Sequence, residues 1–160
     1  MQVRPADPAE IDHLAQVWHD AWYGSHALLA PPDLVRLRTL PNFRDRLAAM
    51  LDTINVVGPV GAPSGFCAIK SDELYQLFVS QAAHGTGVAA ALIADAEKRL
   101  AARGVELAWL ACAVGNMRAA RFYEKSGWDK VGTFVMMSET SIGPFPVDQW
   151  RFEKRLARSA

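Results

Sequence analysis

The sequence predicts a single α/β domain, of the α+β kind, built around a mixed and mostly antiparallel sheet. The chain has 160 residues, of which 51% are hydrophobic and 21% charged, as expected for one globule with a sizeable core. Three short apolar runs within residues 54–80, separated by Gly, Pro and Ser, indicate a meander of strands. A strand, helix, strand crossover over residues 73–114 then adds a parallel pair. We therefore assign residues 1–160 to one domain.

The first third of the chain is predicted to hold one short strand and two helical regions. The strand is expected near residues 2–4. Asp7 is expected to cap a helix over residues 8–23, because proline follows it and a glutamate stands three positions later. A second helical region over residues 33–51 is expected in two pieces, since Pro41 removes a backbone hydrogen bond and restricts the residue before it.

The last two thirds alternate strands and helices after the meander. A helix is expected over residues 88–104, because its apolar residues share one face and a glycine ends it. A strand over residues 105–114 and a short helix over residues 116–126 follow. Two closing strands are expected over residues 128–138 and around residues 147–153. The order gives six to seven strands and about four helices.

Charge and cysteine content exclude several classes of protein. Lys and Arg together number 17, as do Asp and Glu, so no net positive field attracts nucleic acid or an acidic membrane surface. The first residues lack the order of a signal peptide, which favours a cytoplasmic location. Cys67 and Cys112 are flanked by apolar residues and are predicted to be reduced and buried. We expect no metal site.

The segment His84–Ala89, HGTGVA, places two glycines just before a predicted helix. The start of a helix carries unpaired N–H groups and a partial positive charge, and glycine lets a phosphate approach the backbone. A phosphate site is one interpretation, and a tight turn that merely needs glycine is another. A P-loop would need lysine after glycine, which is absent. A dinucleotide site fits Gly-x-Gly-x-x-Ala, but Glu106 opens its strand and only one crossover is present.

Asn116 and Tyr123 are seven residues apart on the predicted short helix, so they lie on one stripe. Ala119 and Ala120 lie between them and leave room for a thin chain to pass. Taken singly, the two polar residues are explained by a helix cap and a half-buried ring.

Together, three segments resemble the GNAT superfamily of acetyl-CoA-dependent N-acyltransferases: ELYQLFV at 73–79, HGTGVAAAL at 84–92 and NMRAARFYEKSGW at 116–128. The resemblance is close over residues 73–133. It implies a sheet with a central pair of splayed parallel strands, and acetyl-CoA as co-substrate. The pyrophosphate motif of the family falls on His84, Gly87 and Ala89, where histidine replaces the usual arginine or glutamine.

The resemblance also implies roles for individual residues. Tyr123 matches the general acid that protonates the leaving thiolate, and Glu73 the base that takes the proton of the amine. His19 and His26 are alternative bases that the sequence leaves open. The residues that would hold the cofactor are Leu77, Phe78, Val79, His84, Gly85, Thr86, Gly87, Val88, Ala89, Asn116, Ala119 and Tyr123.

In the family, the first helices and last strands enclose the acceptor, so Trp18, Trp22, Tyr23 and His26 are the expected substrate-binding residues. Aromatic rings there could hold an apolar or cationic amine. The expected function is transfer of acetyl from acetyl-CoA to a primary amine of a small molecule or peptide. The alternatives are a catalytically weak acyl-CoA-binding module and a dinucleotide-dependent enzyme. The resemblance also allows a homodimer.

Overall fold

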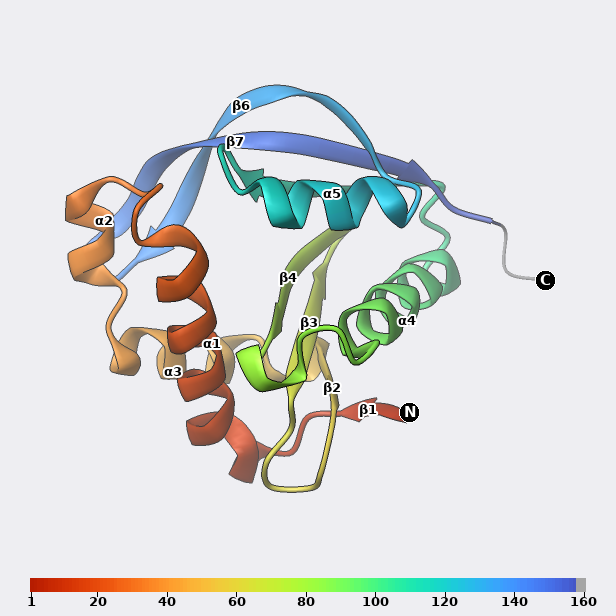
Figure 1. Ribbon diagram of the computed structural model, residues 1–160, viewed down its shortest axis with the longest axis horizontal. Coiled ribbons are helices and arrows are strands. Elements are labelled where there is room, and N and C mark those ends of the chain that lie inside the picture. Colours follow the sequence, from red (N-terminus) through yellow and green to blue (C-terminus); the bar gives the residue numbers. More distant parts are fainter. Residues whose placement is uncertain (158–160) are drawn as a thin grey trace.

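The structure, a computed structural model, describes residues 1–157 and contains one seven-stranded sheet in the order β1-β2-β3-β4-β5-β7-β6. Neighbouring strands are antiparallel except for β4 and β5, so the predicted mixed sheet is confirmed. The elements can be followed in Figure 1. The strands are β1 (Val3–Pro5), β2 (Ile54–Val57), β3 (Gly65–Lys70), β4 (Glu73–Val79), β5 (Leu107–Ala113), β6 (Asp129–Thr140) and β7 (Gly143–Arg155). The helices are α1 (Ile11–His26), α2 (Pro32–Leu37), α3 (Leu40–Ala49), α4 (Val88–Ala102) and α5 (Met117–Lys125).

The predicted start of the first helix is confirmed. Asp7 accepts a hydrogen bond from the Ala9 amide at 2.8 Å, and Glu10 accepts one from the Asp7 amide at the same distance. This capping box fixes a short 3₁₀ turn, η1 (Pro8–Glu10), which leads directly into α1. Helix α1 continues to His26, three residues beyond the predicted end, and this brings His26 toward the centre of the sheet.

The second helical region is in two pieces, as predicted, but the predicted position of the break was wrong. Helix α2 ends at Leu37, and α3 begins at Leu40 with Thr39 as its cap. Pro41 lies within the first turn of α3. Proline fits there because the N–H groups of a first turn have no partner inside the helix.

Two apolar cores lie on opposite faces of the sheet. Helices α1, α2 and α3 cover one face, where Trp18, Phe43 and Phe66 are fully buried. Helices α4 and α5 cover the other face, where Leu92 and Trp128 are buried. Within residues 1–157, no helix is both long and apolar enough to cross a membrane.

Strands β4 and β5 separate soon after they meet. They are paired at one position only, Glu73 opposite Trp109, near the start of β4. The Trp109 amide donates to the Asp72 carbonyl at 3.2 Å. A bulge in the ladder between β3 and β4 leaves Tyr75 without an opposite residue just after this point, and a bulge bends its strand. The splayed pair of parallel strands predicted from the sequence is therefore present.

Candidate active site

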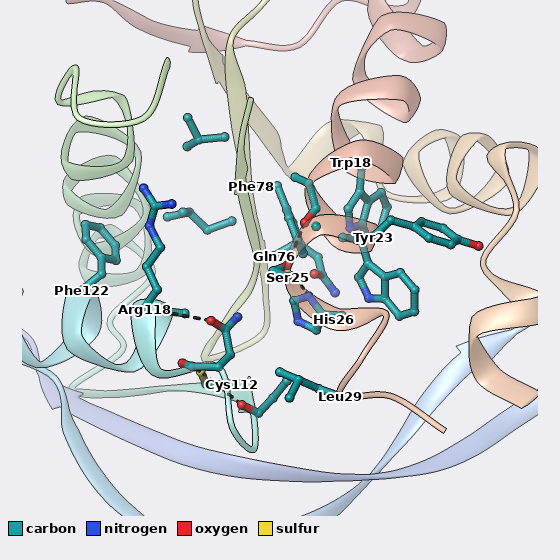
Figure 2. Close-up of a pocket in the computed structure, with 18 of the residues that line it drawn as sticks. Trp18, Tyr23, Ser25, His26, Leu29, Gln76, Phe78, Cys112, Arg118 and Phe122 are labelled. Atoms are coloured by element: carbon teal, nitrogen blue, oxygen red, sulfur yellow. Dashed lines mark hydrogen bonds between the residues drawn. The ribbon is translucent and has the colours of Figure 1, made fainter. Parts of the chain in front are cut away.

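A cavity of about 1440 Å³ lies along the separated ends of β4 and β5. Residues from α1, α4, α5, β4, β5 and the closing strands line it. Figure 2 shows its two sides: Arg118 and Phe122 of α5 lie on one, and Trp18 and Tyr23 of α1 on the other, with Phe78 of β4 between them. The cavity thus connects the glycine turn before α4 with the aromatic residues of α1.

The glycine turn presents free backbone amides to the cavity. Gly85 and Gly87 have positive φ angles of 77° and 89°, which only glycine adopts at little cost, so the turn itself requires both. In residues 1–157, the amides of Gly85, Gly87, Val88 and Ala89 have no hydrogen-bond acceptor. A side chain at Gly85 would meet nothing within 4 Å, so a ligand also has room there. These amides, at the positive end of α4, can donate hydrogen bonds to an anion.

The two other residues of this turn differ in position. His84 is exposed and lines the cavity, where its imidazole can donate a hydrogen bond to an anion. Thr86 does not line the cavity, and its hydroxyl donates to the Ala83 carbonyl at 2.5 Å. The side chain of Thr86 therefore holds the turn and does not face the cavity, whereas His84, Gly85 and Gly87 line it.

Strand β4 offers unpaired backbone groups to the gap. The Ser80 amide donates to the carbonyl of Ser64, the residue just before β3, and Phe66 of β3 lies opposite Phe78. Because backbone groups alternate in direction along an antiparallel strand, those of Leu77 and Val79 face β5, with which they are not paired. The N–H of Phe78 faces β3 instead, so Phe78 contributes its ring to the cavity and not its amide.

Asn116 caps α5 and also lines the cavity. Its side-chain oxygen accepts a hydrogen bond from the Ala119 amide at 3.3 Å, as the predicted cap requires. Its amide nitrogen has no partner among residues 1–157 and can donate to a ligand. Ala119 lines the same wall and leaves space there.

Tyr123 of α5 also lines the cavity. Its side chain is buried and packs against Phe122 and Phe152. Burial, together with the nearby Cys112, raises the pKa of Tyr123 well above its ordinary value. The hydroxyl has no hydrogen-bond partner within residues 1–157, so at neutral pH it is a protonated donor that is free to act on a ligand.

Glu73 lies outside the cavity. It is buried where β4 and β5 still pair, and its Oε2 atom has no hydrogen-bond partner in the part of the chain that the structure describes. Burial raises the pKa of Glu73 to about 7. The structure therefore gives this carboxyl group a pKa suited to proton transfer near neutral pH, but it does not place Glu73 in the cavity beside Tyr123.

The aromatic side of the cavity is built from α1. Trp22 stacks on His26 with ring centroids 5.6 Å apart, and His26 lies 5.9 Å from the Phe78 ring. The His26 Nδ1 atom is 2.6 Å from the Ser25 hydroxyl, which donates to the Ala21 carbonyl. Burial lowers the pKa of His26 to about 4, so the ring is neutral at neutral pH.

Tyr23 and His19 differ from what the sequence suggested. Tyr23 lines the cavity with its ring, but its hydroxyl lies 2.8 Å from the Arg38 carbonyl and 3.0 Å from that of Val35. The hydroxyl therefore holds the chain around α2, and only the ring of Tyr23 lines the cavity. His19 lies outside the cavity beside Asp20, so it is poorly placed to be a base.

Several cavity residues were missed at the sequence level. Each is an ordinary polar residue with no motif around it, and only the fold brings these residues together from distant elements. They are Ser25, Arg38, Arg46, Gln76, Ser138 and Asp148.

Comparison with solved structures identifies relatives of the same fold. A GCN5-related N-acetyltransferase from Rhodopseudomonas palustris superposes with a TM-score of 0.76 at 20% identity, covering 97% of this chain and 95% of the other. An N-acetyltransferase from Staphylococcus aureus Mu50 gives 0.74 at 16% identity over 98% of both chains. An N-acetyltransferase from Thermoplasma acidophilum, in complex with coenzyme A, has a TM-score of 0.66 at 17% identity, covering 96% of this chain and 98% of the other.

A family model described as the Acetyltransferase (GNAT) family matches residues 16–128, which is more than half of the chain. The match includes the splayed strands, the glycine turn before α4, and α5 with Tyr123. The doubly wound parallel sheet that a dinucleotide enzyme of the kind considered above would need is not present in residues 1–157. The chain belongs to the GNAT acetyltransferase family.

Proposed function

We propose that this protein transfers an acetyl group from acetyl-CoA to a primary amine. The observation that supports this best is one continuous cavity that contains the free amides before α4, the unpaired edge of β4 and the Tyr123 hydroxyl. The anion site fits a pyrophosphate, and the strand edge fits the amide groups of a pantetheine arm, which can pair with it as an added strand. Asn116 has a free donor for the same arm.

Acetyl-CoA supplies the thioester from which the acetyl group would move to the amine. The residues of this chain have three tasks: to bind the carbonyl oxygen as it gains charge, to remove a proton from the amine, and to protonate the thiolate. A backbone N–H of β4 that faces the gap, such as that of Leu77, is suited to the first task.

Tyr123 is suited to protonating the thiolate. It remains protonated at neutral pH because burial raises its pKa, and its hydroxyl is not engaged elsewhere in residues 1–157. A hydrogen bond to the sulfur as the carbon–sulfur bond breaks would lower the barrier, even where complete proton transfer is uphill.

A base is needed because an alkylamine with a pKa of about 10 is mostly protonated at neutral pH. Glu73, with a pKa near 7, has the right basicity, but since it does not line the cavity, a water molecule must carry the proton to it. His26 lines the cavity and is neutral, but its lowered pKa makes it a weak base. We therefore assign the role of base to Glu73.

Hydrogen exchange measured residue by residue tests how the cofactor is held. In the free protein, the amides of Leu77 and Val79 should exchange rapidly, and saturating coenzyme A should slow them at least tenfold. The Phe78 amide, which faces β3, is the internal control and should be slow in both states. Equal behaviour of these three amides would contradict the assignment.

Release of free thiol from acetyl-CoA, measured over a panel of amines, tests the reaction itself. Turnover that depends on the amine supports the enzyme. If coenzyme A stabilises the folded protein against heat but no amine gives turnover, the acyl-CoA-binding alternative is indicated. If only NAD stabilises the folded protein, the proposal is contradicted.

A further inference from the structure

Two arginines, Arg38 and Arg46, line the end of the cavity beside α1, α3 and β6, which we call the acceptor end. Neither is paired with a carboxylate in residues 1–157. Arg38, between α2 and α3, is 2% exposed, and Arg46 of α3 is half-buried. Neither forms an ion pair with any residue among 1–157. The two acidic residues that line the cavity, Asp20 and Asp148, are exposed and form no ion pair with either arginine. This end of the cavity therefore carries positive charge that no acidic residue among 1–157 neutralises in an ion pair.

The two guanidinium groups lie near each other, because Arg38 donates to the Asn42 side chain and Arg46 lies one turn after Asn42 on the same face of α3. Burial first, and then Arg46, lower the pKa of Arg38 to about 10, so Arg38 is still charged at neutral pH. The opposing influences of Tyr75 and of the exposed Glu139 are smaller than that of Arg46. Bringing two like charges together in a partly dry cavity is unfavourable, and an anion bound between them would offset that cost.

Both arginines are held in fixed positions by neutral groups. Arg38 donates to the Asn42 side chain at 3.0 Å, to the Glu139 carbonyl at 2.5 Å and to the Ser138 hydroxyl at 2.7 Å. These bonds leave two of its five N–H groups without a partner in residues 1–157. Arg46 lies 4.4 Å above the Trp18 ring, and its Nη2 atom is 3.5 Å from the Tyr75 hydroxyl. The groups are thus positioned before any ligand arrives.

The position of this pair relative to the reaction site limits the size of a ligand. The Trp18 ring is near both: Arg46 lies 4.4 Å above it, and the Phe78 ring of β4 is 5.9 Å away. The bonds from Arg38 to Ser138 and Glu139 also tie the segment between α2 and α3 to β6, and so enclose this end of the cavity. In Figure 1, α2 lies against the far ends of β6 and β7. A small molecule fits such an enclosed end better than a continuous polypeptide.

We infer that the acceptor is an amino acid, whose carboxylate binds between Arg38 and Arg46 while its amine faces the gap between β4 and β5. The placement of the amine rests on the proposed function, and the placement of the carboxylate rests on the two arginines. Guanidinium groups bind carboxylates with charge-assisted hydrogen bonds, which are stronger than neutral ones. The apolar rings of Trp22 and Phe78, which line the cavity, favour an apolar or aromatic side chain.

The test compares the proteinogenic amino acids with their amides as acceptors, in wild type and in Arg46→Gln. The variant should lower kcat/KM for the acids by a factor of about 10 to 100 and leave the amides nearly unchanged. Converting the carboxylate to an amide also alters the pKa of the neighbouring amine. The deciding quantity is therefore the ratio of kcat/KM between wild type and Arg46→Gln for each substrate, and not the ratio between substrates. Arg44→Gln, an exposed arginine on the same helix outside the cavity, is the matched control and should change neither.

Binding of the acids to the protein loaded with coenzyme A, measured by calorimetry, separates the two hypotheses. Amine turnover with the same loss for acids and amides in Arg46→Gln would overturn the inference and leave the proposed function standing. Acid binding that Arg46→Gln abolishes, without turnover on any amine, would support the carboxylate site and contradict the proposed catalysis. The absence of acid binding at millimolar concentration would overturn the inference whatever the turnover.

Discussion

At the scale of single residues, burial raises the pKa of both candidate catalytic groups, and the consequence differs between them. It keeps the Tyr123 hydroxyl protonated, as a donor requires, and it raises the pKa of the Glu73 carboxyl into the range where a base can both take and release a proton. Tyr123 lines the cavity and Glu73 does not. The two proposed roles therefore need separate tests.

Tyr123→Phe should lower kcat by about 10- to 100-fold and leave the affinity for acetyl-CoA nearly unchanged. The substitution removes only a hydroxyl that has no partner in residues 1–157, so the ring still packs and folding should be intact. Steady-state thiol release gives kcat, and calorimetry with coenzyme A gives the affinity. Unaltered turnover would contradict the role of Tyr123 as the acid.

Glu73→Gln should change how stability depends on pH. The raised pKa means that the folded protein keeps a proton between about pH 4.5 and 7 while the unfolded chain releases it. Wild type should therefore lose roughly 2 to 3 kcal/mol of unfolding free energy relative to the variant as pH rises from about 5 to 8. Urea unfolding of both proteins at several pH values measures this.

If the difference in unfolding free energy between wild type and Glu73→Gln stays constant over that range, Glu73 is not protonated in the folded protein near neutral pH. The same variant reports on catalysis. Removal of the base should abolish the rise of kcat/KM with an apparent pKa near 7, and a pH profile like that of wild type would assign the base to another group.

At the scale of elements, the ends of α4 and α5 combine folding and binding in the same groups. Helix α4 begins with amides that no residue among 1–157 satisfies, and α5 begins with an asparagine that uses its oxygen for the helix and leaves its nitrogen free. Helix ends supply such groups because the first turn cannot pair its own N–H groups.

Asn116→Asp separates the two uses of that side chain. Aspartate is as good a helix cap as asparagine, so the unfolding free energy should change by less than about 0.5 kcal/mol. The donor is lost, so affinity for coenzyme A should fall by about tenfold or more. Asn116→Ala should lose the affinity and also about 1 kcal/mol of stability. Equal affinity of wild type and Asn116→Asp for coenzyme A would show that the nitrogen contacts no cofactor.

At the scale of the whole molecule, one sheet carries both apolar cores, so the two should unfold together. Leu14 and Leu92 are fully buried on opposite faces and form a matched pair. Alanine at either position should lower the unfolding free energy by about 2 to 5 kcal/mol. In both variants, circular dichroism and tryptophan fluorescence should give a single transition with the same midpoint. Different midpoints would contradict the assignment of the chain to one domain.

Much of this architecture could be predicted from the sequence. The strand ELYQLFV was placed at Glu73–Val79 without error, because alternation and flanking turn residues are local signals. The glycine turn and the Asn116 cap were also found, since each depends on a few neighbouring residues. The break between α2 and α3 was misplaced, because proline was treated as a helix breaker at a position where a first turn accepts it.

The tertiary structure alone decided how the site is composed. Arg38 and Ser138 are 100 residues apart in sequence, yet they share a hydrogen bond at the acceptor end of the cavity. Glu73 and Tyr123 are both buried, yet only Tyr123 reaches the cavity, because β4 and β5 separate after Glu73. The sequence by itself determined most of the elements and the glycine turn before α4, since these follow from local backbone preferences. Which side chains meet, and how far each is removed from water, depends on packing between distant elements, and that sets both charge and access.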